Sequence, residues 1–589
     1  MGWEAWYILA VVVVTMVVLA RSWLPPSGAM VGAMIAALVP GVVTPAEALA
    51  GFANPAPITI AALYVVAKAV EKTGVLAPLV NWMLGGGRNE KASMMRMSVT
   101  TTAVSSFLNN IPIVAMLIPQ VESWSRAQGR SVSRYLMPLS YAAILGGAVT
   151  LMGTATNIVA SGLLEAIGEE PLGFFEITWV GLPIAIVAGV ALILLSPMLI
   201  PDRQSARGST DESIRAFVVD MTVIDGSSID GETVEKAGLR HLSGVFLVSL
   251  ERNGYTVAPV TPDTRLSGGD RIRFVGRSSD IVDLQAINGL SSAENEHVAD
   301  LAGGDANYYE AVIGADSPLV GEGVRESGFR GRYQAAIVAV HRAGERIDSK
   351  IGDIVFQVGD TLMLVADVGF KARWADRNAF LLISPVRPAP PTTNKRAPLV
   401  ALVGIGIVAM SATGVLPLVT AALTGALILV VGGAVRPGEA RRAVDLDVVV
   451  TVAAAFGLAA AIDISGLGTT LADGIIGLAE PFGEIAVLGA IVLITIVLKE
   501  VITNKGSVLL LTPVAFSVAT STGGDPRGYA IAIAVASALA FLTPIGYQTN
   551  TMVYGPGGYR FSDYLRLGLP LTAIAFIGIL VIVPLKWAL

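Results

Sequence analysis

Residues 97–121, MSVTTTAVSSFLNNIPIVAMLIPQV, form a stretch of 25 residues without a charge. The length suits one crossing of a membrane, but Asn109, Asn110 and Pro112 interrupt the apolar pattern near its middle. Asn side chains are costly in lipid, and a proline removes a helical hydrogen bond and clashes with the preceding turn. We therefore expect a re-entrant hairpin, in which two half-helices meet at a polar tip inside the protein. A plain helix with a polar helix–helix contact is the alternative.

A second stretch repeats this motif. Residues 501–515, VITNKGSVLLLTPVA, place Thr503-Asn504-Lys505 at an equivalent tip. Paired interruptions in corresponding halves are the best sequence indication of the binding site of a secondary transporter. The repeat therefore favours the hairpin interpretation of both stretches.

Each tip is followed by a second polar interruption. The first is Gly153-Thr154-Ala155-Thr156-Asn157, and the second is the segment 543–550, TPIGYQTN. Asn157 follows Asn110 by 47 positions, and Asn550 follows Asn504 by 46. Both interruptions lie in uncharged runs longer than the roughly 20 residues of one crossing helix, so we expect broken helices with unwound centres.

Composition indicates an integral membrane protein, because hydrophobic residues make up 53% of the chain and charged residues only 15%. The absence of cysteine excludes thiol catalysis, disulfides and cysteine metal sites. His241, His297 and His341 all fall in the polar middle region, which excludes a histidine metal site in the membrane part. No nucleophile–base pair is evident, so we expect a transporter and not an enzyme, without a nucleic-acid partner.

The apolar segments fall into two halves with the same plan of three spans, a hairpin, a broken helix and a last span. The ranges are 3–24, 27–43, 57–76, 97–121, 135–168 and 174–200, then 397–414, 416–434, 447–463, 484–522, 528–556 and 567–587. Because a hairpin does not cross, each half crosses five times, and an odd number gives the halves opposite orientations. We therefore expect an α-helical polytopic membrane protein with inverted repeats, re-entrant hairpins and broken helices. The first membrane repeat is 1–200 and the second is 396–589.

Charge distribution predicts the orientation. With the N-terminus outside, nearly all basic residues of the two halves fall in cytoplasmic connections, and Arg527 and Lys586 are the exceptions. We therefore predict a multi-pass protein of the cell (inner) membrane. Its N-terminus lies outside, and the inserted residues 201–390 lie in the cytoplasm.

The insert is charged and shows short alternating strand patterns. It contains a repeat offset by 90 residues, in which Arg252 recurs as Arg342 and Gly269-Asp270 recurs as Gly359-Asp360. We therefore expect two inserted cytosolic α+β domains of the same fold.

Each inserted unit is predicted to hold a strand, a short helix, a β-hairpin and a strand after the Gly-Asp pair. The domains are 210–290 and 300–385, the helices 232–237 and 322–327, the hairpin turns 253–254 and 343–344, and a proline-rich linker follows at 385–391. The pattern resembles tandem RCK C-terminal (TrkA-C) domains, which implies dimerisation and a small-molecule or nucleotide ligand. The insert lacks a Gly-rich dinucleotide fingerprint, and a purely structural dimerisation role is the alternative.

The tips, the first break and the stretch TPIGYQTNTMVYGPGGYRFSDYLRLGLPL at 543–571 resemble the divalent anion/sodium symporter family, which carries sulfate, dicarboxylates or citrate. The resemblance covers both membrane halves. It implies a homodimer, a scaffold part with a moving transport part, an elevator-type mechanism and sodium coupling. The family signature is Ser-Asn-Thr at each tip. Here the tips are Asn109-Asn110-Ile111 and Thr503-Asn504-Lys505, so both keep only the central Asn.

A divalent anion needs fixed donors in place of its water, and half-helix N-termini, Asn amides and Thr hydroxyls supply them. Sodium needs oxygen ligands, which Asn side chains and unwound carbonyls supply. The candidate substrate ligands are Asn109, Asn110, Thr154, Thr503, Asn504, Lys505 and Thr543. The candidate sodium ligands are Asn110, Gly153, Thr156, Asn157, Asn504, Thr549 and Asn550. Each residue alone could instead be a helix cap or an interhelical hydrogen bond.

Lys505 departs from the family pattern, and an ammonium at membrane depth is expensive unless it is paired. It could contact the anion, stand where a second sodium would sit, neutralise Glu500 or extend toward water. We favour the first two roles together.

These observations predict a secondary active transporter of a divalent anion, with sodium-coupled sulfate uptake first. The sulfate preference rests on resemblance, since the TPIGYQTN stretch and the inserted domains are similar to those of bacterial and algal sulfate members. A sodium-coupled dicarboxylate or citrate transporter is the first alternative. A regulated cation/proton antiporter is the second, and it would need a buried carboxylate near the breaks. Asp463 and Glu500 are the candidates, and neither occupies a duplicated position.

Overall fold

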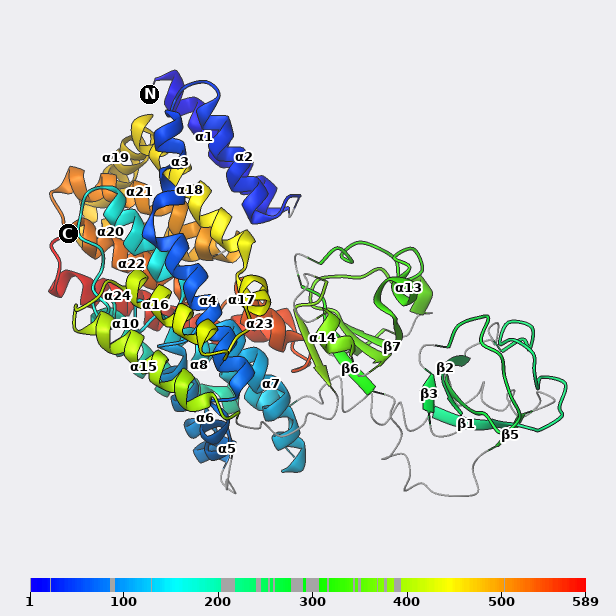
Figure 1. Cartoon of the computed structure of the whole chain (residues 1–589). Helices are drawn as coiled ribbons and strands as arrows, with labels where there is room; N and C mark the ends of the chain where they lie inside the picture. The colour runs from blue at the N-terminus through cyan, green and yellow to red at the C-terminus, as the bar shows by residue number, and fades with distance from the viewer. Residues whose placement is uncertain are drawn as a thin grey trace.

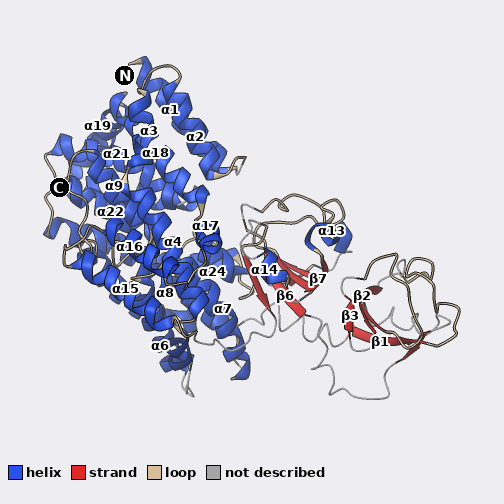
Figure 2. Ribbon diagram, in the orientation of Figure 1, coloured by secondary structure: helices blue, strands red, loops and turns tan. Residues whose placement is uncertain are grey.

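The computed structural model shows a helical body built from both ends of the chain, with two small β-sheets beside it (Figure 1). All strands of the described residues belong to the insert, as Figure 2 shows. The structure describes residues 2–21, 23–84, 90–128, 130–202, 218–239, 245–252, 255–257, 260–276, 290–292, 307–314, 317–342, 345–347, 351–367, 369–374, 379–385, 394–502 and 504–589.

The first half of the body consists of helices α1–α10. They are α1 (Trp3–Ala20), α2 (Pro26–Leu38), α3 (Pro45–Ala53), α4 (Pro55–Thr73), α5 (Ala77–Leu84), α6 (Glu90–Ser105), α7 (Asn110–Ala127), α8 (Ser133–Gly147), α9 (Ala155–Ala166) and α10 (Thr178–Leu199). The second half consists of helices α15–α24. They are α15 (Ala397–Ala412), α16 (Leu418–Val431), α17 (Pro437–Ala443), α18 (Leu446–Ile464), α19 (Leu467–Ala479), α20 (Glu484–Val501), α21 (Asn504–Thr522), α22 (Pro526–Ala538), α23 (Gln548–Tyr554) and α24 (Phe561–Ile582).

The predicted plan of each half is confirmed, with two corrections. The third span begins earlier than predicted, because α3 precedes α4 with a break at Asn54, whose side chain caps α4 through the amide of Ala56. Three short helices, α5, α17 and α19, were not predicted. They are only 7 to 13 residues long, too short for an apolar pattern to mark them as separate elements.

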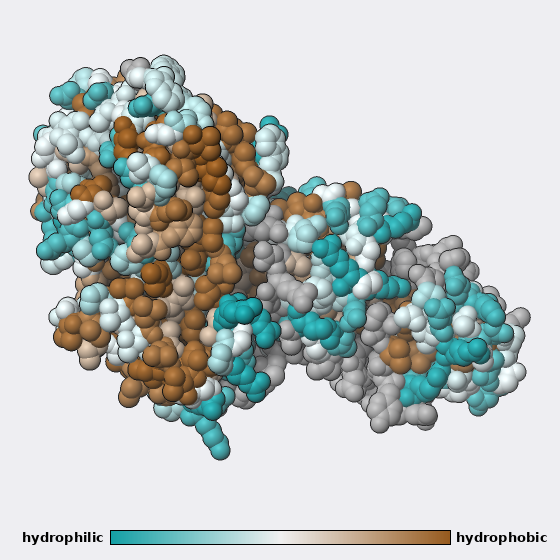
Figure 3. Space-filling view, turned by 45° about the horizontal axis from the view of Figure 1, so that its top comes forward, coloured by the Kyte–Doolittle hydropathy of each residue, from teal (hydrophilic) through white to brown (hydrophobic). Residues whose placement is uncertain are grey.

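Membrane insertion follows from the exposed apolar surface. Five helical segments of the described residues are long and apolar enough to cross a membrane, and α2, α15 and α16 are shorter apolar helices. Figure 3 shows hydrophobic residues spread over the outside of the helical body, while the insert is largely hydrophilic. The chain is therefore a multi-pass membrane protein.

Both hairpins have the predicted form. α6 ends at Ser105 and α7 begins at Asn110, so the tip is the turn between them. The Asn109 side chain accepts a hydrogen bond from the Ile111 amide (3.2 Å), and Pro112 falls in the first turn of α7, where a missing amide hydrogen is harmless. In the second hairpin α20 ends at Val501 and α21 begins at Asn504.

The two broken helices form the centre of the body. α8 and α9 belong to the first, α22 and α23 to the second, and nearly all side chains of α8, α9 and α22 are buried. The halves interlock there, since α9 packs on α21 and α22 while α23 packs on α7 and α8. The unwound segments between the half-helices therefore lie inside protein, where irregular backbone at membrane depth is tolerated.

The insert holds two five-stranded antiparallel sheets of the same topology. The first comprises β1 (Val218–Val223), β2 (Val245–Arg252), β3 (Tyr255–Val257), β4 (Arg271–Gly276) and β5 (Leu290–Ser292), in the order β3-β2-β4-β1-β5. The second comprises β6 (Asn307–Val312), β7 (Ala335–Arg342), β8 (Glu345–Arg346), β9 (Thr361–Ala366) and β10 (Leu382–Pro385), in the order β10-β6-β9-β7-β8. Short helices α13 (Phe329–Tyr333) and α14 (Phe370–Trp374) accompany the second sheet.

An ion pair between an arginine and an aspartate accounts for the charged residues that recur in the two inserted units. Arg252 Nε lies 2.7 Å from Asp270 Oδ1, and Arg342 Nε lies 2.7 Å from Asp360 Oδ1. Both aspartates are buried, at 1% and 0% exposure, so each unit is built around the same ion pair.

The predicted helices at 232–237 and 322–327 are wrong, because these segments are turns. Isolated bridges join Thr233 to Arg265 and Gly323 to Val355, so the backbone there pairs across the unit instead of coiling. The predicted hairpins are present as β2–β3 and β7–β8, but the turn residues 253–254 and 343–344 lie outside the described residues. Most of the predicted linker also lies outside them.

The second sheet rests on the helical body beside α23 (Figure 1). Val312 and Leu382 join the same hydrophobic cluster as the membrane helices. A Cβ added to Gly555, at the end of α23, would overlap the Thr361 hydroxyl at the start of β9. The insert therefore touches the element that follows the second break.

Candidate transport site

The first hairpin tip and the two helix breaks meet at the centre of the body, and α21, which begins at the second tip, packs on α9. Tyr547, in the second break, accepts a hydrogen bond from Asn110 Nδ2 at the first tip (2.9 Å) and lies 3.4 Å from Thr154 Oγ1 in the first break. In the other direction, Ser140 Oγ of α8 lies 2.8 Å from Asn550 Oδ1 and 2.9 Å from Thr549 Oγ1. Residues roughly 400 positions apart thus form one polar cluster within an apolar surround.

Asn157 and Asn550 hold the two breaks in the same way. Asn157 Nδ2 donates to the carbonyls of Gly147 (3.0 Å) and Thr150 (2.8 Å), ten and seven positions earlier. Asn550 Nδ2 donates to Ala540 (3.1 Å) and Thr543 (3.2 Å), at the same two spacings. The amide nitrogens therefore fix the unwound loops. Their oxygens differ, because Asn550 Oδ1 is bonded to Ser140 while Asn157 Oδ1 has no partner among the described residues.

The two tip asparagines have different surroundings. Asn110 has two polar contacts, since Ser105 Oγ lies 2.8 Å from its Oδ1 and its Nδ2 donates to Tyr547. Its amide also lies so close to Gly147 that a Cβ there would come within 2.8 Å of it. Asn504 is only 7% exposed, yet neither atom of its amide has a partner among the described residues. A buried amide without partners is costly and suggests a bound ligand.

The predicted threonines line the breaks. Thr154 and Thr156 are buried with their hydroxyls 3.4 Å apart, and Thr549 is fully buried. Thr543 Oγ1 donates to Glu500 Oε2 (2.7 Å) and accepts from the Gly546 amide (2.8 Å).

Three predicted ligands remain: Gly153, Lys505 and Thr503. Gly153 is buried, and a Cβ there would lie 2.6 Å from the Gly147 carbonyl oxygen, so the break needs glycine at this position. Lys505 is half-buried in the first turn of α21. Thr503 lies outside the described residues.

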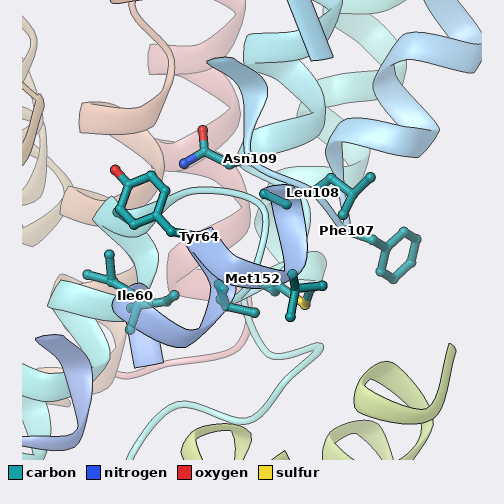
Figure 4. A pocket seen from close by; sticks show the side chains of 11 residues that line it. Ile60, Tyr64, Phe107, Leu108, Asn109 and Met152 are labelled. Atoms are coloured by element: carbon teal, nitrogen blue, oxygen red, sulfur yellow. The ribbon is translucent and has the colours of Figure 1, made fainter. Parts of the chain in front are cut away.

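A small pocket opens beside the first tip (Figure 4). Its walls are apolar residues of α4, the first tip, the first break and α9, and its polar groups come from Tyr64 and Asn109. Figure 4 shows the polar ends of Tyr64 and Asn109 on the same side, while Leu108 and Phe107 turn away from them. Asn109 is thus the predicted tip residue that faces an open space.

The antiporter alternative would need a buried carboxylate free to titrate. Asp463 is exposed at the end of α18. Glu500 lies near the second break, where it accepts from the Thr543 hydroxyl and from the Leu542 amide (3.4 Å). Glu500 is therefore engaged in holding the break. Among the described residues, no three His, Asp or Glu side chains are grouped in a way that could hold a metal ion.

Sequence reasoning missed Lys499, Tyr547 and Ser140. Tyr547 lies inside the second polar interruption but was not singled out as a ligand, and Ser140 was an ordinary member of an uncharged run. Only the packing of the two halves brings both to the site. Lys499 is fully buried and donates to the carbonyls of Ala536 (2.8 Å) and Leu539. A lysine near the end of an 18-residue apolar helix would ordinarily extend to water, so its position alone gave no signal.

Comparison with known proteins agrees with this architecture. The sequence profile of the citrate transporter family matches residues 11–504 and 483–589. A putative sulfur deprivation response regulator of Chlamydomonas reinhardtii is 36% identical over 564 residues, which cover 93% of this chain and 95% of that protein. Sodium/sulfate cotransporter 2 of the same alga is 25% identical, with 97% of this chain and 88% of that protein covered.

Among solved structures, the YdaH transporter of Alcanivorax borkumensis is similar with a TM-score of 0.45 and 13% identity, covering 92% of this chain and 87% of that chain. The profile match over nearly the whole length and the 36% identical relative are decisive for the family. The expectation of a transporter and not an enzyme is thereby confirmed, and the chain belongs to the citrate transporter family.

Proposed function

We propose that this protein carries out sodium-coupled uptake of a divalent anion, with sulfate as the first candidate. The observation that carries the proposal is the packing of α9 on α21, together with the Asn110–Tyr547 hydrogen bond that joins the start of α7 to the second break. Helix N-termini present free amide groups and a positive dipole end, which suit an anion held without water. The nearby side chains are mostly neutral amides and hydroxyls, which serve an anion and a cation alike.

Sodium would occupy the first half. Asn157 Oδ1 is buried without a partner among the described residues, while its Nδ2 is held by two carbonyls of the first break. Asn110 and Gly153 both lie against Gly147, which also holds Asn157, so with Thr156 they would supply further oxygens. The name of the algal sodium/sulfate relative supports sodium as the coupling ion.

The anion would lie between the tips. Asn504, Asn109 and Thr154 would donate to it, and Lys505 would add a charge. At roughly 4 Å and an effective dielectric constant of about 20, one pair of unit charges is worth about 4 kcal/mol before desolvation. Sulfate is preferred to a dicarboxylate because the algal relatives are named for sulfur or sulfate, whereas the family description names citrate.

The wider arrangement is proposed to follow the resemblance: a homodimer, an elevator-type movement, the N-terminus outside and the insert in the cytoplasm. The insert would be two RCK C-terminal domains over 210–290 and 300–385. Its contact with the end of α23 supports a regulatory role, since that helix follows directly on the second break.

The test is uptake of labelled sulfate by proteoliposomes that contain the full chain, with a sodium or a choline gradient. We expect uptake that requires sodium and is inhibited by excess unlabelled sulfate. Citrate and succinate are added as competitors, and inhibition by one of them without inhibition by sulfate would move the assignment to that class. Cation-dependent proton movement without anion uptake would favour the antiporter.

A further inference from the structure

Lys499 is a buried cation held by neutral oxygens. Its side chain has 0% exposure, and its ammonium donates to the carbonyls of Ala536 (2.8 Å) and Leu539 at the end of α22. The carbonyls of a last helical turn have no amide partner within the helix, so they can receive a cation. Glu500, the next residue, directs its carboxylate to the Thr543 hydroxyl (2.7 Å). Burying an ammonium in this position costs free energy, so its presence here points to a function for its charge.

The inverted repeat assigns Lys499 a counterpart. Position 499 precedes the tip residue Asn504 by five as position 105 precedes Asn110, and position 536 precedes Asn550 by fourteen as position 143 precedes Asn157. In the first half, Ser105 Oγ lies 2.8 Å from the Ala143 carbonyl oxygen, and its one proton is shared between this oxygen and Asn110 Oδ1. In the second half, Lys499 Nζ donates to the Ala536 carbonyl, also at 2.8 Å. The same contact is thus made by a neutral hydroxyl in one half and by an ammonium in the other.

The difference between serine and lysine at this position alters the surroundings of the tip asparagine that follows it. Ser105 Oγ also bonds Asn110 Oδ1, so the first half gathers three oxygens, from a hydroxyl, an amide and a carbonyl. Three neutral oxygens at one place are the kind of ligand set that a sodium ion needs. In the second half the corresponding place already holds a positive charge, and the Asn504 amide is left without a partner among the described residues.

We propose that the ammonium of Lys499 is a tethered cation that takes the place of one coupling sodium, so that mobile sodium binds in the first half alone. The inference rests on the proposed sodium-coupled anion transport. A tethered charge helps to neutralise the bound anion, but it returns with the protein in every cycle. It therefore adds to anion affinity and nothing to the coupling with the sodium gradient. The Asn504 amide, which has no partner within the described part of the chain, remains available to the anion.

The experiment measures thermal stability of the purified full-length protein against sodium concentration, with choline chloride at constant ionic strength and no divalent anion. A ligand that binds only the folded state stabilises it by RT ln(1 + [L]/Kd) per site, so the number of sites sets the slope against the logarithm of concentration. We expect Lys499→Ser, which copies the first half, to roughly double the wild-type slope. Lys499→Met removes the charge without adding an oxygen, so it should keep the wild-type slope. The reciprocal Ser105→Lys should abolish the response.

A wild-type slope in Lys499→Ser, or an equal rise in Lys499→Met, would overturn the proposal. If Lys499→Ser fails to fold, Ser105→Lys decides, because a retained sodium response in that variant contradicts the equivalence. Failure of the proposed function gives a different result. Wild-type proteoliposomes would then take up no sulfate, whereas the gain of sodium sensitivity by Lys499→Ser would stand.

Discussion

The two tip asparagines offer a test in which stability and function separate. Asn110→Ala removes two hydrogen bonds, from Ser105 (2.8 Å) and to Tyr547 (2.9 Å). At about 1 kcal/mol for each, the loss should be roughly 2 kcal/mol, because Ser105 and Tyr547 keep their contacts with Ala143 and Thr154. Asn504→Ala removes an amide that has no partner among the described residues, at 7% exposure. Relief of an unsatisfied buried group, worth about 1–3 kcal/mol, should offset the packing that is lost.

Both variants should lose anion uptake, but only Asn110→Ala should lose stability. The assay compares the melting temperature of each purified protein in choline chloride with its sulfate uptake in proteoliposomes. A residue kept at a cost to stability is expected where function requires it. The reasoning would be refuted if Asn504→Ala transported at nearly the wild-type rate, or if it were destabilised as much as Asn110→Ala.

Three further changes test other parts of the structure. Asn157→Ala removes two hydrogen bonds that hold the first break, so it should destabilise the protein by roughly 2 kcal/mol. Asn550→Ala should destabilise it by at least as much, because it removes the equivalent bonds of the second break. A variant as stable as the wild type in a thermal melt would show that its asparagine does not hold the break. Gly555→Ala should push the second sheet away from α23 and speed proteolysis of the insert, while anion binding persists. Gly189→Ala is the control, because a Cβ at that position meets nothing within 4 Å. Unchanged proteolysis of Gly555→Ala would show that the contact between the sheet and α23 is loose. Lys505→Thr should weaken anion affinity more than about tenfold, a loss above roughly 1.4 kcal/mol, and an unchanged affinity in equilibrium binding would place Lys505 outside the site.

The sequence by itself determined where the helices break. Asn109-Asn110 before Pro112, and Gly153 with the polar residues after it, disfavour a continuous helix through local backbone chemistry, which needs no knowledge of distant contacts. Both hairpins and both broken helices lie where this chemistry predicts. The inserted repeat could also be recognised from the sequence, because its ion pairs join residues of the same unit. Arg252 and Arg342 each bind an aspartate 18 positions later.

The tertiary structure alone decided what the polar side chains do. Asn157 and Asn550 were predicted as ion ligands, and the fold shows that their nitrogens hold the loops, which leaves only the oxygens to consider. Contacts such as Asn110 with Tyr547 join residues 437 positions apart, and no local pattern encodes them. The short helices α5, α17 and α19 were missed for a similar reason, since packing and not length stabilises them.

Lys505 and Lys499 show most clearly that the tertiary structure, and not the local sequence, decides whether a charge is buried. Lys505 attracted notice because it interrupts a known motif, whereas Lys499 was passed over, because a lysine near the end of an apolar helix ordinarily reaches water. Only the folding of α20 against α22 reveals that Lys499 is the fully buried one, with carbonyl partners 37 and 40 positions away. Whether a charge is solvated or sealed depends on what the rest of the chain places over it, and a sequence pattern does not contain that information.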